Sequence, residues 1–183
     1  MNRWLIALAL LVPVSVPWIL PPTAKSSPAT EAALHQPAMN DAIIYTVTLP
    51  ADLGVPEQEY KCLAQAVYFE ARSEPIQGQH AVAEVVLNRV DDARFPDTVC
   101  GVVFQNEQRR HRCQFSFACD GRSDKPREQR PWEEARQIAA VVLLGIGGEV
   151  TNEATHYHAT YVQPYWANRL DRTVQVGQHI FYR

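Results

Sequence analysis

The sequence predicts an α+β domain that is mainly α, with a small antiparallel sheet at its C-terminal end. Two largely apolar segments, 57–73 and 78–90, and a third segment, 131–148, have the residue spacing and the end signals of helices. Short alternating segments follow after residue 153. Helices that precede strands, without βαβ alternation, are typical of the α+β class.

The first predicted helix, 57–73, has one largely apolar face with spacings of three and four residues. That face consists of Leu63, Ala66, Val67 and Glu70. Pro75 ends this helix, because helical geometry is disfavoured for the residue before a proline. The second helix is apolar almost all round, which predicts a buried central position. The third begins with Pro131 and ends in glycines, the usual start and stop residues.

A long polar loop is predicted between the second and third helices. The stretch FPDTVCGVVF is expected to turn back across the surface, and residues 106–130 form the loop around CQFSFAC. Loops of that length in a compact domain are often functional. Beyond the third helix, residues 154–162 alternate as in a strand, and residues 172–183 predict two short strands around Gly177.

The N-terminal segment predicts export from the cytoplasm. It has one arginine and then an apolar run from Trp4 to Leu20, which is the pattern of a secretory signal. The run is near the short limit for a membrane span and contains two prolines. We therefore expect residues 1–24 to be a signal peptide, or an anchor in the inner membrane through residues 4–20. Both alternatives place the rest of the chain outside the cytoplasm.

The remaining chain divides into a linker and one domain. Residues 25–56 are rich in Pro, Ala and Ser, which predicts a tether, and residues 57–183 are long enough for a single core. The composition is that of an ordinary globular protein, with 46% hydrophobic and 20% charged residues. The net charge is −3 and the pI is near 6.1, which argues against a nucleic-acid partner.

Export would place the four cysteines in an oxidising compartment, where disulfides persist. Cys62, Cys100, Cys113 and Cys119 allow three pairings. We favour Cys113 with Cys119, which closes a short loop and leaves Cys62 with Cys100. The spacings do not favour a zinc site, and paired sulfurs cannot act as nucleophiles. No metal and no cofactor are predicted.

Glu70 is the first candidate for chemistry, because a carboxyl on an apolar helix face holds its proton to higher pH. Such an acid can protonate a leaving group, as glycosidases require. The alternative is a structural ion pair with Arg72, Arg89 or Arg94, or a capping role. Glu74 follows at i+4 and would be its neighbour if the helix continued that far, so that the two carboxyls would separate their pKa values. The alternative for Glu74 is an exposed charge at the helix end.

His156 and His158 form an H-x-H on a predicted strand, where both side chains point the same way, as two metal ligands could. No third ligand stands at a helpful spacing, so ordinary polar or aromatic contacts are the competing interpretation. Nearby aromatic residues could stack on sugar rings or serve packing. These residues are Tyr157, Tyr161, Tyr165 and Trp166.

Several motifs resemble the cell-wall hydrolase family that includes the spore-cortex-lytic enzymes. They are LAQAVYFEARSEPIQGQHAVAEVVLNRV, FPDTVCGVVFQ, CQFSFACDG and the terminal HIFYR, and together they extend over about residues 60–183. The resemblance implies a lysozyme-like domain of two lobes, related to lytic transglycosylases that act on peptidoglycan. The cysteines resemble a branch found in Gram-negative bacteria, which implies wall remodelling in the periplasm rather than spore germination.

Carried over position by position, the resemblance implies roles for individual residues. Glu70 of YFEAR is the implied catalytic acid, and Glu74 of SEP supports it. Ser73 stands where the family usually has glycine. The other matching positions are implied to bind substrate, and they are Thr98, Gln114, Phe115, Ser116, Asp120, His156 and Tyr157.

The resulting hypothesis is cleavage of the β-1,4 bond between N-acetylmuramic acid and N-acetylglucosamine, with Glu70 first as acid and then as base. If Glu70 takes its proton from the muramoyl C6 hydroxyl, a 1,6-anhydro sugar results. If it activates water, the product is a reducing end, and an inverting hydrolase would need a second carboxylate about 6.5–9.5 Å away, for which Asp120 is the candidate. Two other classes remain open. One is a non-catalytic peptidoglycan-binding protein, and the other is a metal-dependent amidase using His156 and His158.

Overall fold

The computed structural model describes residues 54–109 and 112–183. The predicted signal or anchor, residues 1–24, and the linker up to residue 53 lie outside the described residues. Within the described part, no helix is both long enough and apolar enough to cross a membrane.

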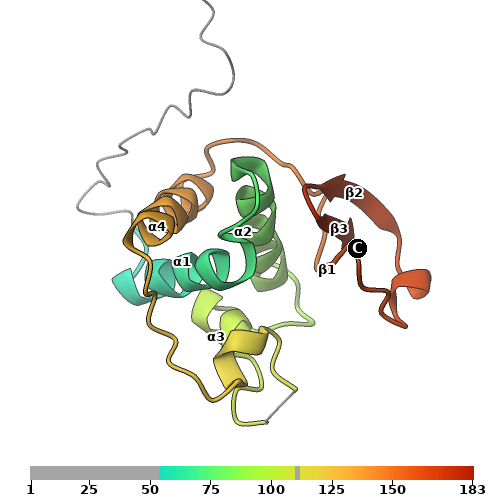
Figure 1. Cartoon of the computed structure of the whole chain (residues 1–183). Coiled ribbons are helices and arrows are strands. Elements are labelled where there is room, and N and C mark those ends of the chain that lie inside the picture. Colours follow the sequence, from blue (N-terminus) through green and yellow to red (C-terminus); the bar gives the residue numbers. More distant parts are fainter. Residues whose placement is uncertain (1–53, 110–111) are drawn as a thin grey trace, which may run out of the picture. The chain divides into compact units, whose positions relative to one another are not determined.

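The helices form the larger part of the described domain (Figure 1). They are α1 (Glu57–Ala71), α2 (Ile76–Val90), α3 (Val99–Val103) and α4 (Gln129–Leu143). Helix α1 packs against the other three, because its apolar residues surround it rather than forming one narrow stripe. Leu63 and Val67 are fully buried there, and burial of each such side chain contributes about 1.5–3 kcal/mol.

Most helix boundaries lie within about two residues of the predicted ones, but α4 ends at Leu143, five residues before the predicted end at residue 148. Helix α1 ends at Ala71, short of the proline that was expected to stop it, and α2 begins directly after Pro75. Helix α4 begins at Gln129 rather than at Pro131. Proline is tolerated in this first turn, because the N–H groups there have no helical acceptor.

One helix was not predicted. The stretch FPDTVCGVVF was expected only to turn back across the surface, but it contains the five-residue helix α3. Thr98 caps this helix, since its Oγ1 accepts a hydrogen bond from the Gly101 N–H at 3.1 Å. The long loop that follows also has a short 3₁₀ turn, Ser116–Cys119.

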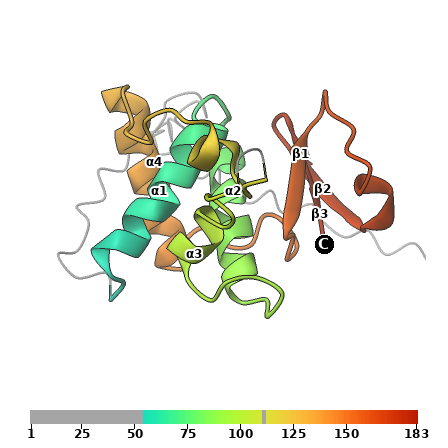
Figure 2. The ribbon, with the colours of Figure 1, turned by 90° about the horizontal axis from the view of Figure 1, so that it is seen from below.

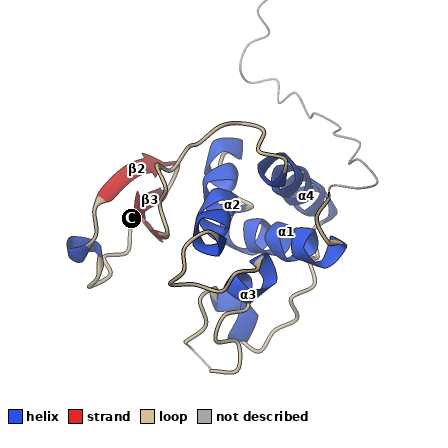
Figure 3. Ribbon diagram, turned by 180° about the vertical axis from the view of Figure 1, so that it is seen from behind, coloured by secondary structure: helices blue, strands red, loops and turns tan. Residues whose placement is uncertain are grey.

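The C-terminal sheet has the predicted antiparallel form. Its strands are β1 (His156–Ala159), β2 (Arg172–Val176) and β3 (His179–Tyr182), in the order β1-β3-β2. Gly177 makes the turn between β2 and β3 with a φ of +55°, a conformation that favours glycine. Helix α2 lies between the sheet and the pair α1 and α4 (Figure 2, Figure 3). The domain is therefore mainly α with a small β lobe, as predicted.

Two apolar clusters stabilise the two lobes. The larger lies among the helices, and the smaller joins α2 to the sheet through residues that include Val85 and Phe181. Tyr157 packs against both clusters. This tyrosine therefore stands at the junction of the lobes.

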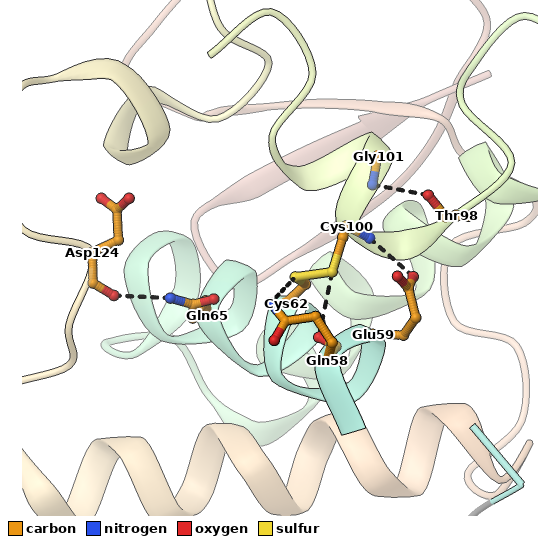
Figure 4. Close-up of a disulfide and its surroundings, with 8 residues drawn as sticks. All are labelled: Gln58, Glu59, Cys62, Gln65, Thr98, Cys100, Gly101 and Asp124. Atoms are coloured by element: carbon orange, nitrogen blue, oxygen red, sulfur yellow. Dashed lines mark hydrogen bonds between the residues drawn. A yellow bond between two sulfur atoms is a disulfide. The ribbon is translucent and has the colours of Figure 1, made fainter. Parts of the chain in front are cut away.

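Both favoured cysteine pairs are formed. Cys62 and Cys100 join α1 to α3 with their Cα atoms 5.2 Å apart, and Cys113 and Cys119 close the loop after α3 with a Cα separation of 6.1 Å. Figure 4 shows the first bridge, beside which the Glu59 carboxylate accepts a hydrogen bond from the Cys100 N–H at 3.1 Å. The bridges therefore fix both ends of the segment 100–119, which leads from α3 to the loop beside the candidate site.

Candidate active site

Glu70 lies in the last turn of α1 and lines a pocket of about 560 Å³. The side chain is partly buried. The opposite wall is the segment 116–128, which we call the pocket loop. The polar residues that line the pocket beside Glu70 are Arg72, Ser116, Asp120, Arg122, Ser123, Asp124, Lys125, Arg127 and Glu128.

Polar side chains of α1 hold the pocket loop in place. Gln65 donates from Nε2 to the Asp124 carbonyl at 2.9 Å, a contact visible in Figure 4. The Tyr68 hydroxyl accepts hydrogen bonds from the N–H groups of Arg127 and Glu128, each at 3.1 Å. These bonds satisfy backbone groups that loops otherwise leave to water. The helix that carries Glu70 therefore also positions the wall in front of it.

Aromatic stacking holds the other end of the pocket loop. Phe69, next to Glu70, stacks on Phe117 with ring centroids 4.5 Å apart and planes 19° from parallel. Phe117 also meets Phe104 and Phe115, at centroid distances of 6.1 and 6.2 Å. Contacts of this kind contribute about 0.5–1.5 kcal/mol each beyond area burial.

The environment of Glu70 favours its protonated form. Burial raises the pKa of the Glu70 carboxyl above its ordinary value and is the largest effect. A hydrogen bond from Tyr157 and the charge of Arg89 oppose that rise in pKa. Glu70 thus holds its proton to higher pH than an exposed glutamate, which is the property of a general acid.

The alternative of a structural ion pair for Glu70 is contradicted by the geometry. Arg72 pairs instead with Glu128, with Nε 3.3 Å from Oε1, and Arg94 pairs with Asp92. Within the described ranges, no Lys, Arg or His nitrogen lies within 4.0 Å of the Glu70 carboxyl oxygens.

Arg89, at the end of α2, is buried behind Glu70, with 2% of its surface exposed. Its Nε donates to the Thr155 carbonyl at 2.7 Å, and its guanidinium carbon lies over the rings of Phe95 and Phe115, at 5.4 and 5.6 Å from their centroids. With its amide oxygen turned toward Arg89, Gln114 accepts from Nη1 and Nη2 at 3.1 and 3.2 Å. Burial lowers the pKa of Arg89 to about 10, so the guanidinium stays charged at neutral pH.

Tyr157 on β1 extends toward the helices, where its hydroxyl donates to the Glu70 carboxyl. Its ring is fixed by an edge contact with His179 at 5.1 Å and by Phe181 at 5.7 Å. Burial, as the largest effect, raises the pKa of Tyr157 well above its ordinary value, so the phenol remains a hydrogen-bond donor. The sequence placed Tyr157 in a substrate-binding motif, and in the structure its hydroxyl contacts the candidate acid.

His156 and His158 lie on the other side of β1, because neighbouring residues of a strand alternate. The His156 ring is 5.4 Å from Trp166, and its Nδ1 is 2.9 Å from Thr155 Oγ1. In the neutral His158 ring, Nδ1 donates to the Ala159 carbonyl and Nε2 accepts from the Tyr182 hydroxyl, both at 2.9 Å. Both ring nitrogens of His158 are thus engaged. In the described part of the chain, no three His, Cys, Asp or Glu side chains gather as a metal site.

The predicted aromatic cluster is divided between the two faces of the sheet. Tyr157 lies on the face toward Glu70, whereas Trp166 packs on the two histidines of the opposite face. Tyr161 and Tyr165 are each 81% exposed. The residues therefore do not form one stacking surface.

Glu74 does not neighbour Glu70 as the helical spacing predicted, because α1 ends before it. Its side chain is buried, and its Oε2 accepts from the Gln178 N–H at 2.9 Å in the turn between β2 and β3. A Cβ at Gly177 would collide with the same oxygen. The carboxylate of Glu74 thus holds the sheet against the start of α2, and the expectation of an exposed charge at the helix end is wrong.

The remaining candidates fall in three places. Ser116 and Asp120 line the pocket with Glu70. Gln114 and Phe115 lie behind it, against Arg89. Thr98 is outside the pocket lining and caps α3 (Figure 4).

Several residues of the pocket were not predicted from the sequence. Arg122, Asp124, Lys125 and Arg127 line the pocket. They belong to the segment 106–130 that was expected to be functional, but no regular spacing distinguished them. Arg89 was considered only as an ion-pair partner.

The fold and the pocket define a cell-wall hydrolase domain. The model of the Cell Wall Hydrolase family matches residues 73–182, and the chain belongs to this family. The matched residues begin just after Glu70.

Curated relatives are spore cortex-lytic enzymes. The chain is 36% identical to the spore cortex-lytic enzyme of Bacillus subtilis strain 168 over 131 residues, which are 70% of this chain and 38% of the relative. It is 35% identical to the spore cortex-lytic enzyme of Oceanobacillus iheyensis over 131 residues, which are 70% of this chain and 42% of the relative. The chain thus spans less than half the length of these relatives.

Two solved structures are similar to the domain. The catalytic domain of the Bacillus cereus SleB protein has a TM-score of 0.57 and 32% identity, and the match covers 74% of this chain and 95% of that one. The catalytic domain of the germination-specific lytic transglycosylase SleB from Bacillus anthracis has the same score and identity, with 71% and 98% covered.

Proposed function

We propose that the domain is a peptidoglycan glycosidase, specifically a lytic transglycosylase that cleaves the N-acetylmuramic acid β-1,4-N-acetylglucosamine bond. The observation that carries the proposal is the position of the Glu70 carboxyl in the wall of an open pocket, where burial raises its pKa. The names of the similar proteins, spore cortex-lytic enzyme and lytic transglycosylase, support this substrate class.

In the proposed reaction, Glu70 donates its proton to the glycosidic oxygen as the oxocarbenium-like transition state develops. The carboxylate that remains accepts the Tyr157 hydrogen bond and then takes a proton from the nucleophile. If the nucleophile is the muramoyl C6 hydroxyl, the product is a 1,6-anhydro sugar. General acid–base catalysis of this kind contributes about 10²–10⁴-fold.

The lytic route is favoured because the second carboxylate of the motif is engaged elsewhere. Glu74 accepts from Gln178 and lies buried at the sheet. Asp120, Asp124 and Glu128 are further carboxylates of the same pocket, and Asp120, which belongs to the matching motif, is the candidate to activate water; this keeps hydrolysis as the alternative. Asp120→Asn should abolish a hydrolase that uses Asp120 and leave a transglycosylase largely active, and Asp124→Asn and Glu128→Gln apply the same test to the other two carboxylates.

The direct test is digestion of purified sacculi by the folded protein, with masses of the released muropeptides. Anhydro products identify the lytic route, and reducing ends identify hydrolysis. Glu70→Gln should reduce release about 10²–10⁴-fold. Glu57→Gln removes an exposed carboxylate from the other end of α1 and is the matched control, expected to retain full activity. Binding without release by the wild type would instead identify a non-catalytic binding protein.

We propose further that the chain acts in the periplasm, where its substrate would lie, in cell-wall remodelling. The predicted signal or anchor of residues 1–24 is the basis for this part of the proposal. Fractionation of the producing cells tests it, and sequencing the N-terminus of the recovered protein separates a cleaved signal from a retained anchor. Recovery from the cytoplasm alone would contradict export.

A further inference from the structure

Arg89 is a buried cation whose burial needs an explanation. Only 2% of its surface is exposed, and no carboxylate among the described residues lies within 4.0 Å of its guanidinium. Burying a charge without an adjacent counter-ion is costly. Hydrogen bonds and aromatic faces offset part of this cost, and they come from separate segments of the chain.

The contacts of Arg89 converge on the surroundings of Glu70. The Thr155 carbonyl, 2.7 Å from Nε, immediately precedes the strand that carries Tyr157. Gln114, at 3.1 and 3.2 Å, and the ring of Phe115 belong to the loop closed by the second disulfide. A planar guanidinium has the fork of donors needed to bind both segments at once, which a lysine does not have.

We propose that Arg89 is a positioning residue of the glycosidase site, which fixes Tyr157 and the Gln114–Phe115 segment around Glu70 and keeps a positive charge behind the Glu70 carboxyl. The inference rests on the proposed function of Glu70. It assigns to Arg89 a role in both halves of the reaction, although the guanidinium is too deeply buried to touch a glycan strand.

The two halves of the reaction place opposite demands on Glu70. The carboxyl must be protonated before bond cleavage and ionised afterwards. Burial favours the first state, whereas the charge of Arg89 and the hydrogen bond from Tyr157 favour the second. Arg89 thereby limits the cost of forming a carboxylate in a desolvated position.

Other charged groups face the pocket from the solvent side. Arg72 stands at the end of α1, paired with Glu128. The charged residues of the pocket loop are Asp120, Arg122, Asp124, Lys125, Arg127 and Glu128. Burial raises the pKa of Glu70, whereas Tyr157 and Arg89 lower it, so Arg89 is the charge whose removal should alter that pKa most.

The test compares Arg89→Gln, which is neutral but keeps a donor, with Arg89→Lys, which keeps the charge and loses the fork. The full chain would be assayed on solubilised glycan strands between about pH 4 and pH 9. Removing the positive charge disfavours the Glu70 carboxylate, so Arg89→Gln should move the alkaline limb of the kcat profile up by about one pH unit. Its maximal kcat should fall at least tenfold with KM changed less than twofold. Arg89→Lys should show its alkaline limb at the same pH as the wild type, and its maximal kcat should fall less than that of Arg89→Gln.

Asn88→Ala is the matched control, because Asn88 stands beside Arg89 and donates to the Ala154 carbonyl at 2.9 Å. It loosens the same junction without removing the charge, so its pH limb should stay in place. If Arg89→Gln loses activity with an unmoved limb, or if Arg89→Lys moves it equally, Arg89 is only a structural residue and the proposal fails.

A second measurement does not depend on turnover. Titration of the Glu70 side-chain carbon by NMR in wild type and Arg89→Lys should give similar midpoints, and Arg89→Gln should give a higher one. Equal midpoints in all three proteins would overturn the inference. If the wild type releases nothing from sacculi, the proposed function fails while this coupling can still be measured.

Discussion

The hydroxyl of Tyr157, on the first strand of the sheet, is hydrogen-bonded to the carboxyl of Glu70, in the last turn of α1. The bond crosses the junction of the two lobes, where the Tyr157 ring packs against both apolar clusters. The orientation and the protonation of the candidate acid therefore depend on how the sheet packs against the helices.

Tyr157→Phe should weaken catalysis and alter its pH dependence. The hydroxyl stabilises the Glu70 carboxylate, so its loss raises the pKa of Glu70 and moves the alkaline limb of the rate profile to higher pH. A hydrogen bond to a charged group is worth about 1.5–3 kcal/mol, which corresponds to roughly a 10–100-fold loss of kcat. Initial rates on glycan strands across the pH range measure both effects.

Tyr182→Phe is the matched control for this variant. It removes a hydroxyl from the same sheet, one that contacts His158 at 2.9 Å on the opposite face from Glu70. Its pH profile should match that of the wild type. An identical shift in both variants would show that the effect arises from general loosening of the sheet.

Glu70→Gln should stabilise the fold at neutral pH while it removes activity. The folded-state pKa of Glu70 is raised, so ionising the carboxyl above its unfolded value of about 4.5 destabilises the native state. A neutral glutamine avoids this cost. We expect the thermal midpoint of the variant to exceed that of the wild type by a few degrees at pH 7. Near pH 4 both side chains are uncharged, so the difference should vanish there. A constant difference at all pH values would contradict a raised pKa.

The fold was predictable where the signals are local. Helical spacing, the proline before α2 and the glycine between β2 and β3 lie within a few residues of the elements they define. Helix α3 was not predicted because five residues are too few to display apolar periodicity. Thr98, as a capping residue, was the only local signal for it. Three helix ends shifted by two residues and the C-terminal end of α4 by five, since capping and tertiary contacts decide them.

The site was predictable only at its centre. Glu70 stood out because a carboxyl on an apolar helix face is a local anomaly. Its partners depend on tertiary packing: the sheet brings Tyr157 to it, and α2 brings Arg89. Arg89 carried no special signal, because a basic residue in the last turn of a helix is ordinary. Strand alternation does separate Tyr157 from His156, but it does not tell which of the two faces the helices.

Glu74→Ala should destabilise the protein more than it slows the reaction. The change leaves the Gln178 N–H without its carboxylate acceptor in a part-buried turn, at a cost of about 1–3 kcal/mol. Because α1 ends before Glu74, kcat of the folded variant should stay within about tenfold of the wild type, far above that of Glu70→Gln. Urea unfolding and sacculus digestion at a temperature where the variant is folded measure the two quantities.

Gln178→Ala is the control for the Glu74 variant, since it keeps the backbone N–H that Glu74 binds. It should be nearly as stable as the wild type. If Glu74→Ala unfolds like the wild type and yet loses activity as deeply as Glu70→Gln, then Glu74 takes part in the chemistry.

The two disulfides should make different contributions to the protein. The bridge between Cys62 and Cys100 spans 38 residues and that between Cys113 and Cys119 spans 6. Loop-closure entropy predicts that replacing the first pair by serines costs about 4 kcal/mol of stability and replacing the second about 2 kcal/mol. The second pair encloses Phe115 and Phe117, whose rings contact Arg89 and Phe69 around Glu70. Its loss should therefore lower kcat in protein that remains folded.

Urea unfolding and rate measurements on the two double-serine variants separate these contributions. The variant lacking Cys62 and Cys100 should retain kcat at a temperature where it is folded, because its bridge joins α1 to α3 away from the pocket lining. The variant lacking Cys113 and Cys119 should lose kcat at the same temperature, because the aromatic wall beside Glu70 is no longer closed. If both variants lose stability but neither loses kcat, the bridge between Cys113 and Cys119 acts only on the unfolded chain. In that case the hydrogen bonds of Gln65 and Tyr68 maintain the wall of the pocket without the bridge.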